Sequence, residues 1–166
     1  MKRTLLLIVL ALALGWAGQS HDVWAHCEIP CGIYGDEMRI AMLYEHVTTV
    51  EKSMKQIDEL SKNPSANANQ LVRWVNNKEV HCNEIQHIVT QYFMTQRIKP
   101  VPESDKTTSN AYQSQLQTLH AMLIHAMKAK QTTDAAHVER LRRLIDEFAE
   151  LYFSEDDLKH LREDHK

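Results

Sequence analysis

One histidine and two cysteines stand within six residues of each other near the amino terminus, at His26, Cys27 and Cys31. If a peptidase leaves His26 at the terminus, five donors become available: its α-amine, its imidazole, the amide nitrogen of Cys27 and the two thiolates. Amine, amide and thiolates can lie in one plane, with the imidazole as an axial ligand. Planar nitrogen and sulfur donation selects Ni(II) or Cu(II) and does not suit tetrahedral zinc. Because thiols reduce Cu(II), nickel is the favoured ion.

A structural disulfide between Cys27 and Cys31 is the competing interpretation, because an exported chain matures in an oxidising compartment. Pro30 and Gly32 flank Cys31, which favours a sharp turn over an extended loop. His26 adjoins Cys27 and adds nitrogen donors that a disulfide does not need. The residues favour a metal and leave the disulfide as an alternative.

The first 25 residues have the pattern of a cleavable export signal. Two basic residues precede an apolar run at 5–14, which is too short to span a bilayer comfortably, and a small-x-Ala site ends at Ala25. We therefore expect a mature chain that begins at His26, is periplasmic or secreted, and keeps no membrane segment. A rival cleavage site after Ala17 would instead leave an extension ahead of His26.

Composition indicates one helical domain. The chain has 166 residues, of which 43% are hydrophobic, and only 4 Gly and 4 Pro, so it is too apolar for disorder and too poor in turn formers for a many-stranded sheet. Its 19 basic and 22 acidic side chains give a net charge of −3, without the basic excess of a nucleic-acid-binding protein.

Four segments repeat apolar residues at steps of three and four, which is the period of an amphipathic helix. We expect helices over about 36–62, 67–98, 111–130 and 135–153. The apolar positions are, in chain order, Ile40, Leu43, Val47, Val50, Met54 and Ile57; Leu71, Trp74, Val75, Cys82, Ile85, Ile88, Val89 and Tyr92; Tyr112, Leu116, Leu119, Leu123 and Met127; and Val138, Leu141, Ile145, Phe148 and Tyr152. Lys78 and His81 interrupt the second stripe with polar groups.

Such helices, joined by short connections, bury their stripes most simply as an up-down antiparallel four-helix bundle, so the predicted fold class is all-α. The bundle is expected over residues 36–153. An irregular metal-binding segment at 26–35, called the hook below, precedes it, and the signal peptide occupies 1–25. Residues 154–166 are mostly charged and are expected to form a frayed tail.

The pattern His-Cys-x-x-Pro-Cys-Gly-x-Tyr, followed by a helical bundle of this size, resembles the nickel-dependent superoxide dismutase family. Six residues match it: His26, Cys27, Pro30, Cys31, Gly32 and Tyr34. The resemblance implies an enzyme that converts superoxide to dioxygen and hydrogen peroxide, with a nickel ion cycling between Ni(II) and Ni(III) at the processed terminus. It also implies a homohexamer with the hooks facing inward.

By this resemblance, His26 supplies its amine and an axial ring, Cys27 its thiolate and amide nitrogen, and Cys31 the second thiolate. Tyr34 is expected to stand over the open face of the metal and to limit access to small molecules. The backbone N–H groups of Glu28 and Cys31 are expected to hold the superoxide anion.

This sequence departs from the family at the residues that support the axial ring. There, a glutamate early in the first helix holds the ring and is paired with an arginine on the second helix. Ala41 stands at the glutamate position here, and His81 stands at the arginine position. Glu45, one helical turn after Ala41 on the same face, is the nearest carboxylate. We expect Glu45 and His81 together to replace the missing pair.

Two other functions fit the residues. The chain could be an exported nickel- or copper-binding carrier that holds the ion without turnover, or an exported bundle with a structural disulfide. A mature terminus at His26 with free thiols and one bound nickel fits the enzyme or the carrier, and turnover of superoxide separates those two.

Overall fold

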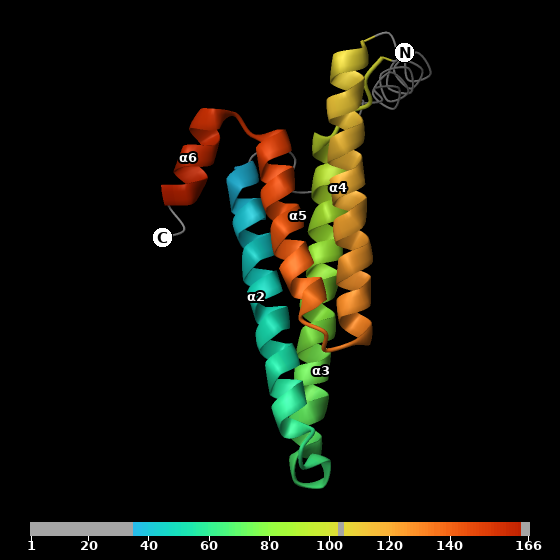
Figure 1. Cartoon of the computed structure of the whole chain (residues 1–166), viewed down its shortest axis with the longest axis vertical. Coiled ribbons are helices and arrows are strands. Elements are labelled where there is room, and N and C mark those ends of the chain that lie inside the picture. The colour runs from blue at the N-terminus through green and yellow to red at the C-terminus, as the bar shows by residue number, and fades with distance from the viewer. Residues whose placement is uncertain (1–34, 103–104, 164–166) are drawn as a thin grey trace, which may run out of the picture.

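The computed structural model describes residues 35–102 and 105–163, and all the regular structure in these ranges is helical. The elements are, in order, α2 (Asp36–Leu60), α3 (Pro64–His87), η1 (Ile88–Arg97), α4 (Lys106–Gln131), α5 (Ala136–Tyr152) and α6 (Glu155–Glu163). Figure 1 shows α2, α3, α4 and α5 running alternately down and up beside one another, which confirms the all-α bundle. None of the described helices is long and apolar enough to cross a membrane.

The predicted signal peptide and all of the hook except its last residue lie outside the described residues. The boundaries at residues 25 and 35 therefore stay predictions. The described structure begins at Gly35, directly before the first turn of α2.

Side-chain caps set where two of the helices begin. The carboxamide of Asn63 accepts a hydrogen bond from the amide of Ala66 at 3.4 Å, and Pro64 occupies the first turn of α3. The carboxylate of Asp105 accepts from the amide of Thr108 at 3.2 Å. Because Asp105 caps it, α4 begins about five residues before the apolar pattern predicts.

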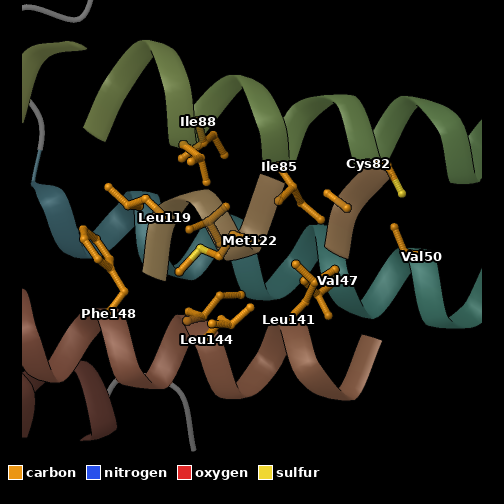
Figure 2. Packing of buried hydrophobic residues seen from close by; sticks show 14 of the residues in the cluster. Val47, Val50, Cys82, Ile85, Ile88, Leu119, Met122, Leu141, Leu144 and Phe148 are labelled. Atoms are coloured by element: carbon orange, nitrogen blue, oxygen red, sulfur yellow. The ribbon is translucent and has the colours of Figure 1, made fainter. Parts of the chain in front are cut away.

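The buried core is one continuous cluster contributed by the four bundle helices and η1 (Figure 2). Most of the predicted apolar positions lie in it, including Leu43, Val47, Cys82, Ile85 and Phe148. The stripe of α4 was predicted correctly at Leu119 but one position out of register after it. Its fully buried residues are Leu119, Met122, Ala126 and Ala129, whereas Met127 is 39% exposed.

The error in α4 has a physical cause. Apolar residues occupy both 122/126 and 123/127, so spacing alone fits two stripes, and the structure buries the one whose small alanines allow close helix approach. Val75, also predicted to be buried, is 40% exposed. It lies three residues before Lys78, whose ammonium already reaches the last carbonyls of α4, so α4 ends before it can cover Val75. Figure 1 shows the α2–α3 pair extending beyond α4 and α5 at this end.

The second predicted helix changes character at Ile88, where α3 continues as the π-helical segment η1. The wider turn is visible in bonds that span five residues: Thr95 Oγ1 donates to the carbonyl of Thr90 at 2.7 Å, and the amide of Ile98 to the carbonyl of Phe93 at 2.9 Å. Such segments are rare and concentrate at functional sites. Here η1 brings Arg97 to the start of α2.

Residues 155–163 form the helix α6, whereas the sequence predicted a frayed tail. The reason is a capping box that the charge pattern concealed. The amide of Asp157 donates to Ser154 Oγ at 3.4 Å, and the amide of Ser154 donates to the Asp157 carboxylate at 3.3 Å. Figure 1 shows α6 standing away from the bundle.

Lys78 is buried, with 4% of its surface exposed. Its ammonium donates to the carbonyl oxygens of Lys130 at 2.8 Å and Thr132 at 2.9 Å. These carbonyls lie at the carboxyl end of α4, where no amide of the helix can reach them. The polar interruption of the second stripe is therefore structural: it fastens the end of α4 to α3.

Replacing Lys78 with methionine should lower the free energy of unfolding by roughly 2–4 kcal/mol, because two buried carbonyls lose a charged donor. Urea denaturation followed by circular dichroism measures this difference. The matched control is Lys99→Met, at an exposed loop position. Equal stability of the two variants would contradict the structural role given to Lys78.

Candidate metal centre

The residues predicted to bind metal and substrate lie outside the described residues: His26, Cys27, Glu28, Cys31 and Tyr34. Their predicted roles therefore stay predictions. What the structure describes is the scaffold to which the hook is attached, beginning at Gly35 and Asp36. Glu45 and His81, the two predicted supporting residues, both lie on described helices.

The Asp36 carboxylate fixes the start of α2 against two other elements. Tyr92 donates its hydroxyl to Oδ1, and Tyr152 donates to Oδ2 at 2.5 Å. Arg97 donates to Oδ2 through Nη2 at 2.6 Å and through Nε at 3.1 Å. These residues, named the Asp36 cluster here, join α2 to η1 and to the last residue of α5. The hook ends at residue 35, directly before this anchor.

The charges of the Asp36 cluster reinforce one another. Partial burial raises the pKa of Asp36, but hydrogen bonds from Tyr152, Tyr92 and Arg97 outweigh burial and hold its pKa below the ordinary 3.8. Burial, followed by the hydrogen bond to Asp36, raises the pKa of Tyr92 and of Tyr152 to about 12. The hydrogen bond to Asp36 also raises the pKa of Arg97. The cluster is therefore an ionised carboxylate held by one guanidinium and two neutral phenols.

A cavity of about 650 Å³ lies along α2. It is lined by Met38, Ala41, Met42, Tyr44, Glu45 and Thr48. Ala41 and Glu45 thus share one face, as their four-residue spacing requires. The carboxylate of Glu45 is exposed and makes no hydrogen bond or ion pair within residues 35–102 and 105–163.

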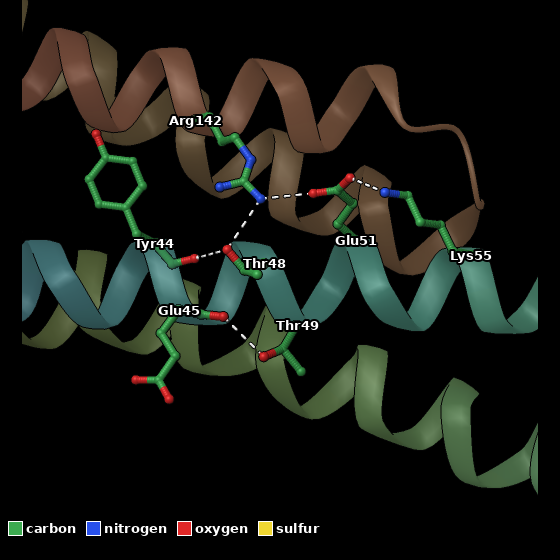
Figure 3. A network of polar contacts seen from close by, with 7 residues as sticks. All are labelled: Tyr44, Glu45, Thr48, Thr49, Glu51, Lys55 and Arg142. Atoms are coloured by element: carbon green, nitrogen blue, oxygen red, sulfur yellow. Dashed lines mark hydrogen bonds and ion pairs between the residues drawn. The ribbon is translucent and has the colours of Figure 1, made fainter. Parts of the chain in front are cut away.

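The wall of this cavity that faces α5 is held by a polar network (Figure 3). Arg142 of α5 donates to Thr48 Oγ1 at 3.2 Å and to the Glu51 carboxylate at 2.8 Å. Lys55 donates to the other oxygen of Glu51 at 2.5 Å. In Figure 3 Glu45 points away from this network, and only its backbone carbonyl is engaged, by the hydroxyl of Thr49 at 3.0 Å.

His81 is paired with His46 instead of Glu45. The two Nδ1 atoms are 2.8 Å apart, so one ring donates and the other accepts. The predicted Glu45–His81 pair does not form in the described structure, because successive helical residues point about 100° apart and His46 is the one directed at α3. His46 Nε2 is buried without a partner in the described structure. Burial, and then the charge of His81, lower the pKa of His46 against opposition from Glu84 and Glu45.

A second histidine pair joins α4 to α5, with the Nδ1 atoms of His125 and His137 3.2 Å apart. Sequence reasoning missed both histidine pairs and the Asp36 cluster. No short-range signal marks them, because each depends on the rotational register of two helices. The one available clue was the position of Asp36 directly after the hook.

Across residues 35–102 and 105–163, no group of three or more His, Cys, Asp or Glu side chains comes together to hold a metal ion. Cys82 is buried in the core, and burial raises the pKa of its thiol to about 11, which favours the neutral thiol over a metal-binding thiolate. The donors of His26, Cys27 and Cys31 fit a nickel ion by their chemistry, as nitrogen and sulfur ligands that can lie in one plane.

The family model described as nickel-containing superoxide dismutase matches residues 21–156. The match includes the hook and α2 to α5, which together are well over half of the chain. No curated protein and no solved structure matches the chain.

Replacing Asp36 with asparagine should lower the free energy of unfolding at neutral pH by about 1–3 kcal/mol, since three donors lose a charged acceptor. The pKa of Asp36 is lowered by folding, so its contribution is complete above about pH 5 and is lost as the pH falls through the folded pKa. The difference in the free energy of unfolding between wild type and Asp36→Asn, called the gap here, should therefore disappear in acid. Urea denaturation at several pH values measures it. Asp58→Asn, at an exposed position of α2, is the control and should show no gap at any pH.

The His46–His81 pair should make the fold sensitive to mild acid. Because the pKa of His46 is lowered by folding, its contribution is complete above the ordinary value of 6.5 and is lost as the pH falls below that value. The variant His46→Gln should lose less stability than wild type between about pH 7.5 and pH 5.5 in urea denaturation. His87→Gln, at an exposed position of α3, should keep the wild-type slope. Equal slopes in all three proteins would refute the interpretation.

Proposed function

The chain belongs to the nickel-containing superoxide dismutase family, and we propose that its reaction takes place at the processed amino terminus. The protein is accordingly an oxidoreductase that acts on superoxide with nickel as its cofactor. The family match favours this enzyme over the carrier and over the disulfide-stapled bundle. The observation that carries the proposal is that the matched range contains the complete six-residue hook pattern as well as the helices.

Three hook residues would hold the metal. His26 offers its α-amine and imidazole, Cys27 its amide nitrogen and thiolate, and Cys31 its thiolate. When bound, nickel supplies one-electron chemistry, in which alternation between Ni(II) and Ni(III) lets one superoxide be oxidised to dioxygen and the next be reduced to hydrogen peroxide. Anionic sulfur and amidate donors favour the higher oxidation state, which a nickel ion in water reaches with difficulty.

The remaining hook residues would control access. Tyr34 limits entry to small molecules, and the backbone N–H groups of Glu28 and Cys31 donate to the superoxide anion. The Asp36 cluster supports this arrangement, because it holds the chain two residues after Tyr34. A fixed attachment point reduces the number of positions that the hook residues 26–35 can take.

Glu45 is the residue that we propose for supporting the His26 ring. Its carboxylate lines the cavity on α2 and has no other partner in the described structure, so it is available to accept a hydrogen bond from an imidazole N–H. His81 contributes indirectly at most, because its ring is engaged by His46.

We further propose that the protein is exported, to the periplasm or out of the cell, after cleavage behind Ala25. The charged and apolar pattern of residues 1–25 supports export. Assembly into a homo-oligomer, a hexamer by family resemblance, is part of the same proposal.

Adding one alanine before His26 tests the proposed site, because the extension converts the amine ligand into a peptide nitrogen and displaces the ring. The dismutation rate, measured on nickel-loaded protein by pulse radiolysis, should fall by at least about a hundredfold, beyond the loss expected for an outer-shell partner. The matched control carries the extra alanine after Lys166 and should keep full activity and helicity.

Mass spectrometry of the exported wild-type protein completes this test. The expected mature chain begins at His26 and carries two free hook thiols. A different terminus, a Cys27–Cys31 disulfide in the nickel-loaded protein, or full activity of the extended variant would each refute the proposed site.

A further inference from the structure

Arg39 lies in the first turns of α2 and is a partly buried cation without an anionic partner in the described structure. Its Nε is buried and has no hydrogen-bond acceptor there. Its Nη1 donates to the sulfur of Met42 at 3.6 Å, and thioether sulfur is a weak acceptor. A buried charged donor costs free energy unless an acceptor satisfies it, so this guanidinium is prepared for a group that the described residues do not supply.

The position of Arg39 is fixed by stacking. Its guanidinium carbon lies 4.9 Å from the centre of the Tyr92 ring, and the hydroxyl of that ring donates to Asp36. The negative charge of Asp36 is already shared by Arg97, Tyr92 and Tyr152, so it does not neutralise Arg39. The Asp36 cluster therefore holds a second cation in place and leaves its hydrogen-bonding capacity unused.

In the described structure, Arg39 does not line the cavity on α2 and is connected to it only through Met42. Met42, which accepts its hydrogen bond, lines that cavity together with Ala41 and Glu45. Along the chain, Arg39 follows Tyr34 by five residues. The unpartnered cation is thus placed four residues after Gly35, where the hook joins α2.

We propose that the guanidinium of Arg39 is a binding site for a small monoanion, and that the anion is superoxide on its way to the metal. This inference rests on the proposed function, since it deepens the same site. A guanidinium presents paired N–H donors in a planar fork, which fits the two oxygens of a diatomic anion. A fixed cation also raises the local concentration of anions and their rate of encounter. Arg39 is then a substrate-binding residue that the hook pattern alone does not include.

The experiment uses the mature, nickel-loaded protein with Arg39→Gln, Arg39→Lys and the control Arg73→Gln, which makes the same charge change at an exposed position of α3. One measurement is kcat/KM for superoxide at increasing ionic strength. The other is the dissociation constant of azide, a small monoanion, by isothermal titration calorimetry. Nickel content and circular dichroism report on the integrity of each variant.

The variant Arg39→Gln should lower kcat/KM roughly three- to tenfold at low ionic strength and flatten its salt dependence, because one fixed charge is removed. It should weaken azide binding by a similar factor. Arg39→Lys keeps the charge and should retain most of the salt dependence, while Arg73→Gln should behave as wild type. Nickel content should be equal in all four proteins.

Three results would overturn the inference. The first is an Arg39→Gln variant with the rate, salt dependence and azide affinity of Arg73→Gln. The second is a loss of nickel with an unchanged rate per nickel ion, which would mean that Arg39 binds the hook. The third is an Arg39→Gln variant that binds azide with wild-type affinity, even where its rate is lower. Failure of the proposed function is distinguishable, because nickel-loaded wild type would then lack turnover while the azide titration still tests the anion site.

Discussion

The Asp36 carboxylate is the point on which the arrangement of the described structure depends most. It is the first residue of α2, and it accepts hydrogen bonds from residues 92, 97 and 152, which come from η1 and α5. These contacts join segments that are 56 to 116 residues apart along the chain. Because all three donors converge on one ionised group, the end of the bundle that carries the hook is held by electrostatic and hydrogen-bonding interactions in addition to apolar packing.

The π-helical segment makes this convergence possible. Phe93 of η1 packs edge-on against Phe148 of α5, with ring centres 4.8 Å apart, while Tyr92 and Arg97 reach Asp36 from the same segment. A π segment winds more residues into each turn than an α-helix and shifts the residues that follow it around the axis. Neighbouring residues of one short segment therefore make both the apolar contact with α5 and the polar contact with Asp36.

The sequence predicts the helices well because burial of an apolar stripe is a local, periodic property. Ile40, Leu43 and Val47 could be assigned to the core from their spacing alone. The part of the α4 stripe after Leu119 could not be assigned in this way. Residues 122/126 and 123/127 are both apolar, and only the neighbouring helices decide which pair is buried. The helix α6 required recognition of the Ser154–Asp157 capping box, a local signal obscured by the surrounding charges.

The candidate site likewise has one part that the sequence predicts and one part that it does not. The proposed ligands of the hook are close together in sequence, so the chemistry proposed for them follows from residue types and spacing alone. The residues around it are not: the partner of His81 is His46 rather than Glu45, and the role of Arg39 depends on stacking against a ring 53 residues later. Such contacts depend on how each helix is rotated about its axis relative to its neighbours. No short stretch of the sequence specifies that rotation.

The protruding part of the α2–α3 pair determines where local unfolding of the bundle costs least. Beyond Lys78, which fastens α3 to the end of α4, two helices continue with only each other for cover. Opening of this extension costs little buried area, so its amides should exchange with solvent well before those near residue 36. We therefore expect thermal fluctuation to be concentrated at the end of the bundle remote from the attachment of the hook, while the end that carries the hook keeps its shape.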